Sequence, residues 1–262
     1  MLTYVAIVPH PPFVVPGFAH EQGPLYDPMR EAMKIVGEDL HALSVDALVC
    51  LSVHGERYEN ALSIAYHDPY LATLRAFGTQ AHDAAFLPHA PLIDGLRRGL
   101  RRADIPVTLS TNTFLDDASS VVLLTWKLFL ESARVVIVTP PSGNTTLLTA
   151  MGRVIRECIE ARSERVAVCA IAHLSERLSS VSPEGIHQDA AQFDERMRHA
   201  IVDQNRSTFK TLARERQAEV GAHELDAIRL LLDILDETRV VFKEHAYVPA
   251  HGIGHVVASA RL

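Results

Sequence analysis

The sequence predicts an α/β fold: a three-layer α/β/α sandwich with a mainly parallel, mixed central sheet. Apolar runs of strand length alternate with segments of helical spacing along most of the chain, which is typical of a sheet covered by helices on both faces. The 262 residues are 48% hydrophobic, which is enough to bury a full core. No internal repeat, low-complexity segment or long linker divides the sequence, so we expect a single domain over residues 1–262.

The first half of the chain alternates between strand and helix signals. The apolar run at residues 2–8 stops at prolines, which cannot continue a strand. Apolar residues at helical spacing follow, and Asp27 and Pro28 fit the N-cap and the first position of that helix. A later apolar segment, which contains the only tryptophan, Trp126, has the same helical spacing. We expect strands at residues 2–8, 46–53, 61–66 and 106–110, and helices at 26–43, 82–103 (interrupted at Pro88 and Pro91) and 116–131.

The second half of the chain closes with two consecutive strands. Before them, the apolar run at residues 134–138 stops at a Pro- and Gly-containing turn, and Asn144 fits the N-cap of the next helix. Only a short turn separates the last two strands, which makes them antiparallel neighbours and the sheet mixed. We expect strands at residues 134–138, 165–171, 239–247 and 254–260, and helices at 144–161, 183–204, 206–217 and 224–235.

Two of the predicted strands are each followed by a histidine. His10 stands after the first apolar run, and His54 follows the run at residues 46–53. Open α/β sheets place their ligands at the carboxyl ends of strands, so the two imidazoles are candidates for one site. Pro11 and Pro12 fix φ and remove backbone donors, which gives His10 a stiff turn that suits a metal ligand. The alternative for each histidine is a hydrogen-bonded loop residue.

A carboxylate is the third ligand to look for, and Glu224 is the best candidate. It stands at the head of a helix that has one apolar face. Two histidines and one carboxylate leave open positions on Fe(II) for substrate and oxygen. The same ligand set suits a catalytic Zn(II). The alternative for Glu224 is that it stabilises its helix, because an acidic side chain near the N-terminus interacts favourably with the positive end of the helix dipole.

Several short motifs, taken in their order along the chain, resemble one family. They are His10-Pro11-Pro12, Ser52-Val53-His54-Gly55, Leu115-Asp116-Asp117, Val135 to Gly143, Leu174 to Leu178, Glu224-Leu225 and Ala250 to His255. With these motifs the chain resembles the class III extradiol ring-cleavage dioxygenases, in particular their catalytic B subunit. The resemblance implies that His10, His54 and Glu224 bind Fe(II), and that a small catechol-type aromatic diol and O2 are the substrates. The Memo group has the same superfamily fold without established ring cleavage.

The chain departs from this family at two positions that usually hold a histidine. Glu176 replaces the acid–base histidine in the motif after Leu174, and Asp117 replaces the histidine of an Asp-His-Gly motif. His173, three residues before Glu176, can stand in as the base. We therefore take Glu176, His173 and Asp117 as catalytic candidates. A Memo-like metal-binding protein without ring cleavage and a zinc-dependent hydrolase are the alternative functions.

Composition and charge narrow the expected partners. A formal net charge of −7 argues against a nucleic-acid partner, and the one basic cluster, at residues 97–102, fits a solvated helix face. No apolar run is long enough to indicate a membrane span. The N-terminus has no signal-peptide pattern and the three cysteines have no close spacing, which fits reduced thiols in the cytoplasm. We expect a homo-oligomer, such as a dimer.

Overall fold

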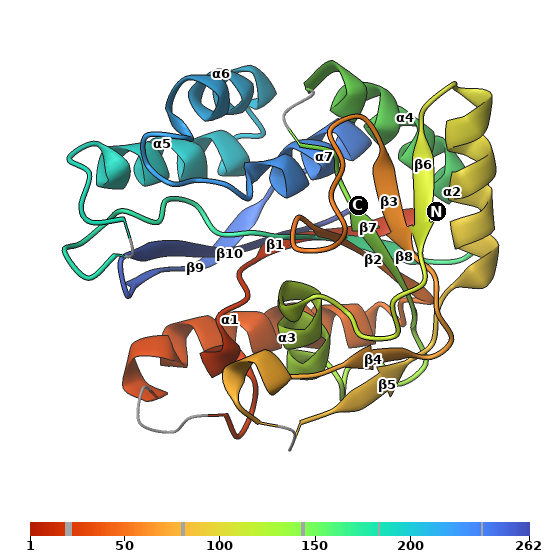
Figure 1. Cartoon of the computed structure of the whole chain (residues 1–262), viewed down its shortest axis with the longest axis horizontal. Helices are drawn as coiled ribbons and strands as arrows, with labels where there is room; N and C mark the ends of the chain where they lie inside the picture. The colour runs from red at the N-terminus through yellow and green to blue at the C-terminus, as the bar shows by residue number, and fades with distance from the viewer. Residues whose placement is uncertain (19–22, 80–81, 143–144, 183, 237) are drawn as a thin grey trace.

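The chain folds around one large sheet with helices on both faces (Figure 1). The computed structural model describes residues 1–18, 23–79, 82–142, 145–182, 184–236 and 238–262. Its eight-stranded sheet has the order β6 (Val107–Ser110), β3 (Leu62–Ala65), β7 (Arg134–Thr139), β2 (Ala47–Ser52), β8 (Val166–Ile171), β1 (Leu2–Val8), β10 (Ile253–Arg261) and β9 (Lys243–Ala250). The predicted α/β/α sandwich is confirmed.

The sheet is parallel at its centre and antiparallel towards both edges. β7, β2, β8 and β1 run parallel to one another. β10 is antiparallel to β1 and to β9, whereas β3 is antiparallel to β7 and parallel to β6. Strands covered on both faces must be apolar on both faces, which explains why β2 and β8 are buried along their whole length. The mixed character predicted from the two closing strands is confirmed.

Two helical layers cover the sheet, and the side chains of β1 show how the faces divide. One layer contains α1 (Gly23–Ala42) and α3 (Asp117–Thr125); the other contains α2 (Ala90–Arg102), α4 (Thr145–Glu160), α5 (Ala190–Val202), α6 (Arg206–Arg216) and α7 (Leu225–Leu235) (Figure 1). Val5 and Ile7 belong to the apolar core under α4 and α7, whereas Tyr4, Ala6 and Val8 belong to the core under α1 and α3. This alternation follows from the two-residue period of a strand.

One prediction was wrong in the segment before α2. Residues 82–89 are not helical, because β5 (Ala84–Phe86) forms a hairpin with β4 (Tyr70–Ala72), which the sequence did not indicate. Pro88 lies between β5 and the start of α2, and a proline at this position ends any helix that precedes it. The helix starts after His89, whose ring nitrogen accepts a hydrogen bond from the Leu92 N–H at 3.1 Å. A three-residue strand is too short to show a period in sequence.

Other boundaries also differ from prediction. α1 begins at Gly23, so Asp27 and Pro28 lie inside the helix instead of capping it. α3 ends at Thr125, and α5 begins at Ala190, later than the predicted 183. The predicted cap Asn144 lies outside the described residues, as does residue 183. Short 3-10 helices occur at η1 (Pro12–Val14) and η3 (Arg75–Phe77).

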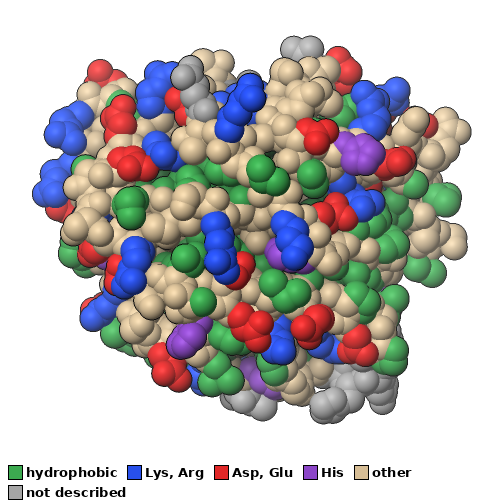
Figure 2. Space-filling model, turned by 180° about the vertical axis from the view of Figure 1, so that it is seen from behind, with side chains coloured by type: hydrophobic (Ala, Val, Ile, Leu, Met, Phe, Trp, Pro, Cys, Tyr) green, Lys and Arg blue, Asp and Glu red, His purple; other side chains and the backbone are tan. Residues whose placement is uncertain are grey.

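The surface carries charges of both signs. On the face seen in Figure 2, lysine and arginine side chains lie among acidic ones instead of gathering into one basic region. None of the helices in the described part of the chain has the length and apolarity to cross a lipid bilayer.

Candidate metal centre

The register of three parallel strands collects three histidines at one edge of the sheet. The carboxyl-terminal residues of β1 and β2 both pair with the last residue of β8. Two residues beyond these paired ends stand His10, His54 and His173. Because carboxyl ends of parallel strands share an edge, imidazoles from three distant segments meet there. The rings of His10 and His54 have centroids 4.6 Å apart, and those of His10 and His173 are 5.6 Å apart.

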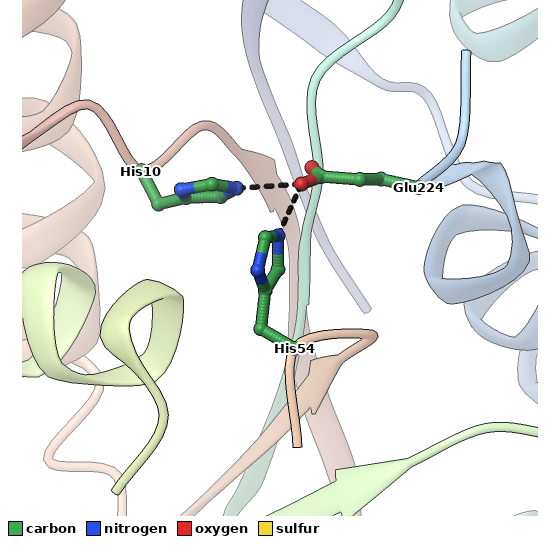
Figure 3. A group of neighbouring side chains, drawn as sticks. All are labelled: His10, His54 and Glu224. Carbon is green, nitrogen blue, oxygen red and sulfur yellow. Dashed lines mark hydrogen bonds and ion pairs between the residues drawn. The ribbon is translucent and has the colours of Figure 1, made fainter. Parts of the chain in front are cut away.

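Glu224 reaches this edge from the N-terminus of α7. Its side chain is buried, and its Oε1 lies 2.9 Å from Nε2 of His10 and also contacts Nε2 of His54 (Figure 3). One ligand atom from each of the three residues lies within 4.8 Å of the others. The Glu224 carboxylate makes no capping hydrogen bond to its own helix. If Glu224 served only to stabilise the start of α7, such a hydrogen bond would be expected, and Glu224 does not make it.

The geometry and donor chemistry of this cluster fit a divalent metal. Metal bonds of about 2.0–2.2 Å place neighbouring ligand atoms roughly 3 Å apart, close to the separation of the His10 and Glu224 atoms. Both histidines present Nε2, and the carboxylate presents a single oxygen. Two imidazole nitrogens and one carboxylate oxygen form the donor set of non-haem Fe(II) sites and of catalytic zinc sites.

His173 holds the second oxygen of Glu224. Its backbone N–H donates to Oε2 at 2.9 Å, and its Nδ1 lies 2.9 Å from the same oxygen. On the other side of the ring, Nε2 lies 2.8 Å from Oε1 of Glu176. The cluster thus extends from Glu176 through His173 to Glu224. Such outer contacts orient a ligand, and here they leave Oε1 to face the two histidines.

The charges of the cluster support each other. Burial by itself would raise the pKa of Glu224, but the nearby His173 and His10 hold that pKa well below its ordinary value. Burial likewise opposes charge on His173, but Glu224 and Glu176 raise its pKa to about 10. The hydrogen bond to Glu224 raises the pKa of His54. Glu224 is therefore ionised at neutral pH, the state that binds a cation.

Asp117 does not join this cluster. Its side chain is exposed in the first turn of α3. The preceding residue, Asp116, faces the site instead and accepts hydrogen bonds from Ser52 Oγ and from the Ser119 N–H, both at 2.9 Å. Asp116 is the N-cap of α3, a role that an aspartate directly before an apolar helix signals in sequence. Of the three catalytic candidates, the structure brings only Glu176 and His173 to the cluster.

A cavity of about 300 Å³ opens beside His54. The ends of β3, β6 and β7 and the segment before α3 form its walls. Its volume is at the lower end of the range for small-molecule sites. Polar and apolar groups both line it, among them Glu56, Asn112, Phe114, Asp116, Ile137 and Thr139.

A group of aromatic rings that was not predicted from the sequence includes Phe13, three residues after His10. The rings of Phe13 and Tyr26 stack with centroids 4.8 Å apart, and the ring centroid of His251 lies 6.1 Å from that of Phe13 and 5.9 Å from that of Tyr26. His255 is buried close to His173, and its Nδ1 has no hydrogen-bond partner. Burial and the neighbouring imidazoles lower the pKa of His255 to about 3.

An ion pair ties the loop of His54 to the helix that follows Glu224. Arg57 contacts the carboxylate of Asp226 and donates to the Pro141 carbonyl oxygen at 3.3 Å. Asp226 also pairs with the buried Arg229 one turn further along α7. Sequence alone could not pair Arg57 with Asp226, which lies 169 residues away.

Comparison with known proteins supports the fold and gives no information on function. No family model matches the chain, and no curated protein matches it. Among solved structures, the uncharacterized protein JW3007 from Escherichia coli K12 matches with a TM-score of 0.63 and 14% identity, over 98% of this chain and 99% of that one. At this identity the similarity establishes a common fold, and function has to be argued from the site.

Proposed function

We propose that this protein is an Fe(II)-dependent dioxygenase of the extradiol type, which inserts O2 into the ring of a small catechol-type aromatic diol. The observation that supports it most is the convergence of His10, His54 and Glu224, with ligand atoms within 4.8 Å of one another. The resemblance of the sequence motifs to the class III enzymes gives the reaction class. The cavity beside His54 gives room for a single-ring substrate.

Each protein group has a distinct part in this proposal. Bound Fe(II) would supply the redox chemistry that lets O2 react with an aromatic diol. His10, His54 and Oε1 of Glu224 would hold the metal, and a set of three protein ligands leaves coordination positions for substrate and O2. His173 fixes the carboxylate of Glu224 by holding Oε2. Positioning of this kind is what brings reacting groups into contact.

The pair of His173 and Glu176 is the proposed proton acceptor. A diol must lose hydroxyl protons to react, and a base within hydrogen-bond reach has to take them. Glu176 is the partly exposed end of the pair, with 22% of its side chain accessible, whereas His173 is 10% accessible. The Glu176 carboxylate would take the proton, and Nε2 of His173 would hold that carboxylate in place.

Metal analysis and oxygen consumption test this function. Protein purified without oxygen should contain iron, or should take up one Fe(II) per chain on reconstitution. With a panel of catechols it should then consume O2 and form a coloured ring-opened product. Iron bound in equal stoichiometry without oxygen uptake on any diol would instead support a Memo-like metal-binding protein.

A zinc-dependent hydrolase is the second candidate. A carboxylate, Glu176, stands next to the cluster where the dioxygenase family usually has a histidine, and a glutamate commonly serves as the general base of zinc hydrolases. In this case the purified protein would retain zinc, and zinc-loaded protein would hydrolyse ester or amide substrates in an assay without O2. Iron-loaded protein would show no oxygen uptake.

A further inference from the structure

The cavity next to the proposed metal centre offers a place for the ring substituent of the substrate. His54 belongs both to the proposed ligand set and to the wall of the 300 Å³ cavity. A diol bound to the metal beside His54 would have room for its ring substituent in this cavity. This inference rests on the proposed function and concerns the charge that the cavity accepts.

The cavity carries negative charge. Asp116 lies on its wall, and its carboxylate is held by Ser52 Oγ, the Ser119 N–H and Ser119 Oγ, the last at 2.7 Å. Glu56 is exposed at the cavity and accepts a hydrogen bond from Nδ2 of Asn112 at 2.8 Å through Oε1. Among the described residues that line this cavity, none is a lysine or an arginine.

Two arginines lie near the cavity, one next to Glu56 in sequence and one packed on Phe114, and both pair with acidic residues outside the cavity. Arg57, in the loop after His54, contacts Asp226 on α7. Arg75 packs over the ring of Phe114, with 5.1 Å from its guanidinium carbon to the ring centroid, and pairs with Asp83 at 2.9 Å. Neither of them belongs to the cavity lining. A carboxylate on the substrate would thus meet two fixed carboxylates without a basic partner on the cavity wall.

We propose that the cavity selects diols whose ring substituent ends in a protonated amine, and that Glu56 is the residue that recognises it. Phe114 and Ile137 provide apolar surface for the carbons between ring and amine. The ammonium would donate to the Glu56 carboxylate, whose Oε1 is already oriented by Asn112. Asp116 adds a second negative charge deeper in the site. The same arrangement disfavours an acidic substituent.

Three catechols whose side chains differ in charge test the charge preference. They are 4-(2-aminoethyl)catechol, 4-ethylcatechol and 3-(3,4-dihydroxyphenyl)propanoate, with positive, neutral and negative side chains. Binding is measured by calorimetry on zinc-loaded protein, which cannot turn over, so affinity is read without activity. The amine should bind best and the acid worst, with about fivefold between successive ligands, as expected for a solvent-accessible charge pair.

Substitution of Glu56 then tests whether this residue causes the charge preference. Glu56→Gln should remove most of the preference for the amine over the neutral diol, because only Asp116 then remains, while the neutral diol binds as before. Glu59→Gln is the matched control, since Glu59 is exposed on the same loop and does not line the cavity. A charge order that is absent or reversed in the native protein, or an amine preference that keeps its native size in Glu56→Gln, overturns the inference. If none of the three diols binds to metal-loaded protein, the proposed function itself fails.

Discussion

Glu224 is the residue on which the candidate site depends, because its two oxygens have different partners. Oε1 faces Nε2 of both His10 and His54, and Oε2 is held by the backbone N–H and ring of His173. The residue is 3% exposed, so its charge has almost no water to stabilise it. A buried carboxylate surrounded by nitrogen atoms needs positive charge, which protonated imidazoles or a metal ion can supply.

His54→Ala should abolish metal retention and leave the fold intact. The side chain of His54 is 38% accessible, so its removal takes little apolar surface from the core, and we expect a loss of stability of about 1 kcal/mol. Metal content and melting temperature are measured on the same samples. His223→Ala is the matched control, because His223 adjoins Glu224 in sequence but is 58% accessible and faces Glu184. Metal retained at full stoichiometry in the His54 variant would remove this residue from the ligand set.

Glu176→His should increase the turnover of simple catechols by iron-loaded protein. A carboxylate is in general a weaker base than an imidazole, so the native protein should cleave such diols slowly or not at all. A matched base contributes roughly 100-fold to such steps, which sets the scale of the expected gain. Oxygen uptake and the coloured product are compared in both proteins. Fast native turnover that persists in Glu176→Ala would exclude Glu176 and make His173 the base.

At the scale of elements, the site depends on one helix and one loop being held together. α7 carries Glu224 at its head, and the loop after β2 carries His54. The contact of Arg57 with Asp226 joins the two, and the Pro141 carbonyl adds the turn after β7 to the same contact. A ligand on a loop is positioned only as well as the loop is, so this ion pair is expected to act through His54.

Arg57→Met should weaken metal affinity by about tenfold, in the range found for groups that orient metal ligands. Asp226 keeps Arg229 as its partner, so no buried charge is left alone, and the methionine retains the apolar stem. The dissociation constant is measured by competition with a chelator. Arg98→Met on α2 removes an arginine that is 65% accessible and pairs with Asp94, and it should leave metal affinity unchanged. Equal affinity in both variants would show that the loop holds His54 without this ion pair.

At the scale of the whole molecule, the sequence predicted what repeats along an element and missed what depends on contacts between elements. The central strands were correct because burial on both faces leaves a continuous apolar run, as in β8. The β4–β5 hairpin was missed because three-residue strands carry no period. His10 and His54 could be placed at strand ends, whereas Asp117 was chosen one residue away from Asp116, which faces the site. The pairing of Arg57 with Asp226 follows only from the packing of α7 on the sheet.

Folding also places one histidine where it cannot take a proton easily. His255 lies on β10, 5% exposed, and its Nδ1 has no hydrogen-bond partner. Burial first, and the neighbouring imidazoles of His173 and His10 second, lower its pKa to about 3, compared with about 6.5 in an unfolded chain. Between these pH values the unfolded chain binds a proton at this position and the folded chain does not. Acid therefore favours the unfolded chain.

The stability that depends on neutral His255 is fully present above pH of about 6.5 and is lost progressively as the pH falls towards about 3. His255→Leu removes the titrating group at similar volume, so the free energy of unfolding of this variant should fall less steeply between pH of about 6.5 and about 3 than that of the native protein, whatever the change in stability at pH 7. The free energy of unfolding is measured by urea titration at several pH values in this window, and the test is its slope against pH. His41→Leu, at an exposed position, is the control and should keep the native slope. A His255→Leu slope equal to the native one would mean that other groups cause the acid sensitivity.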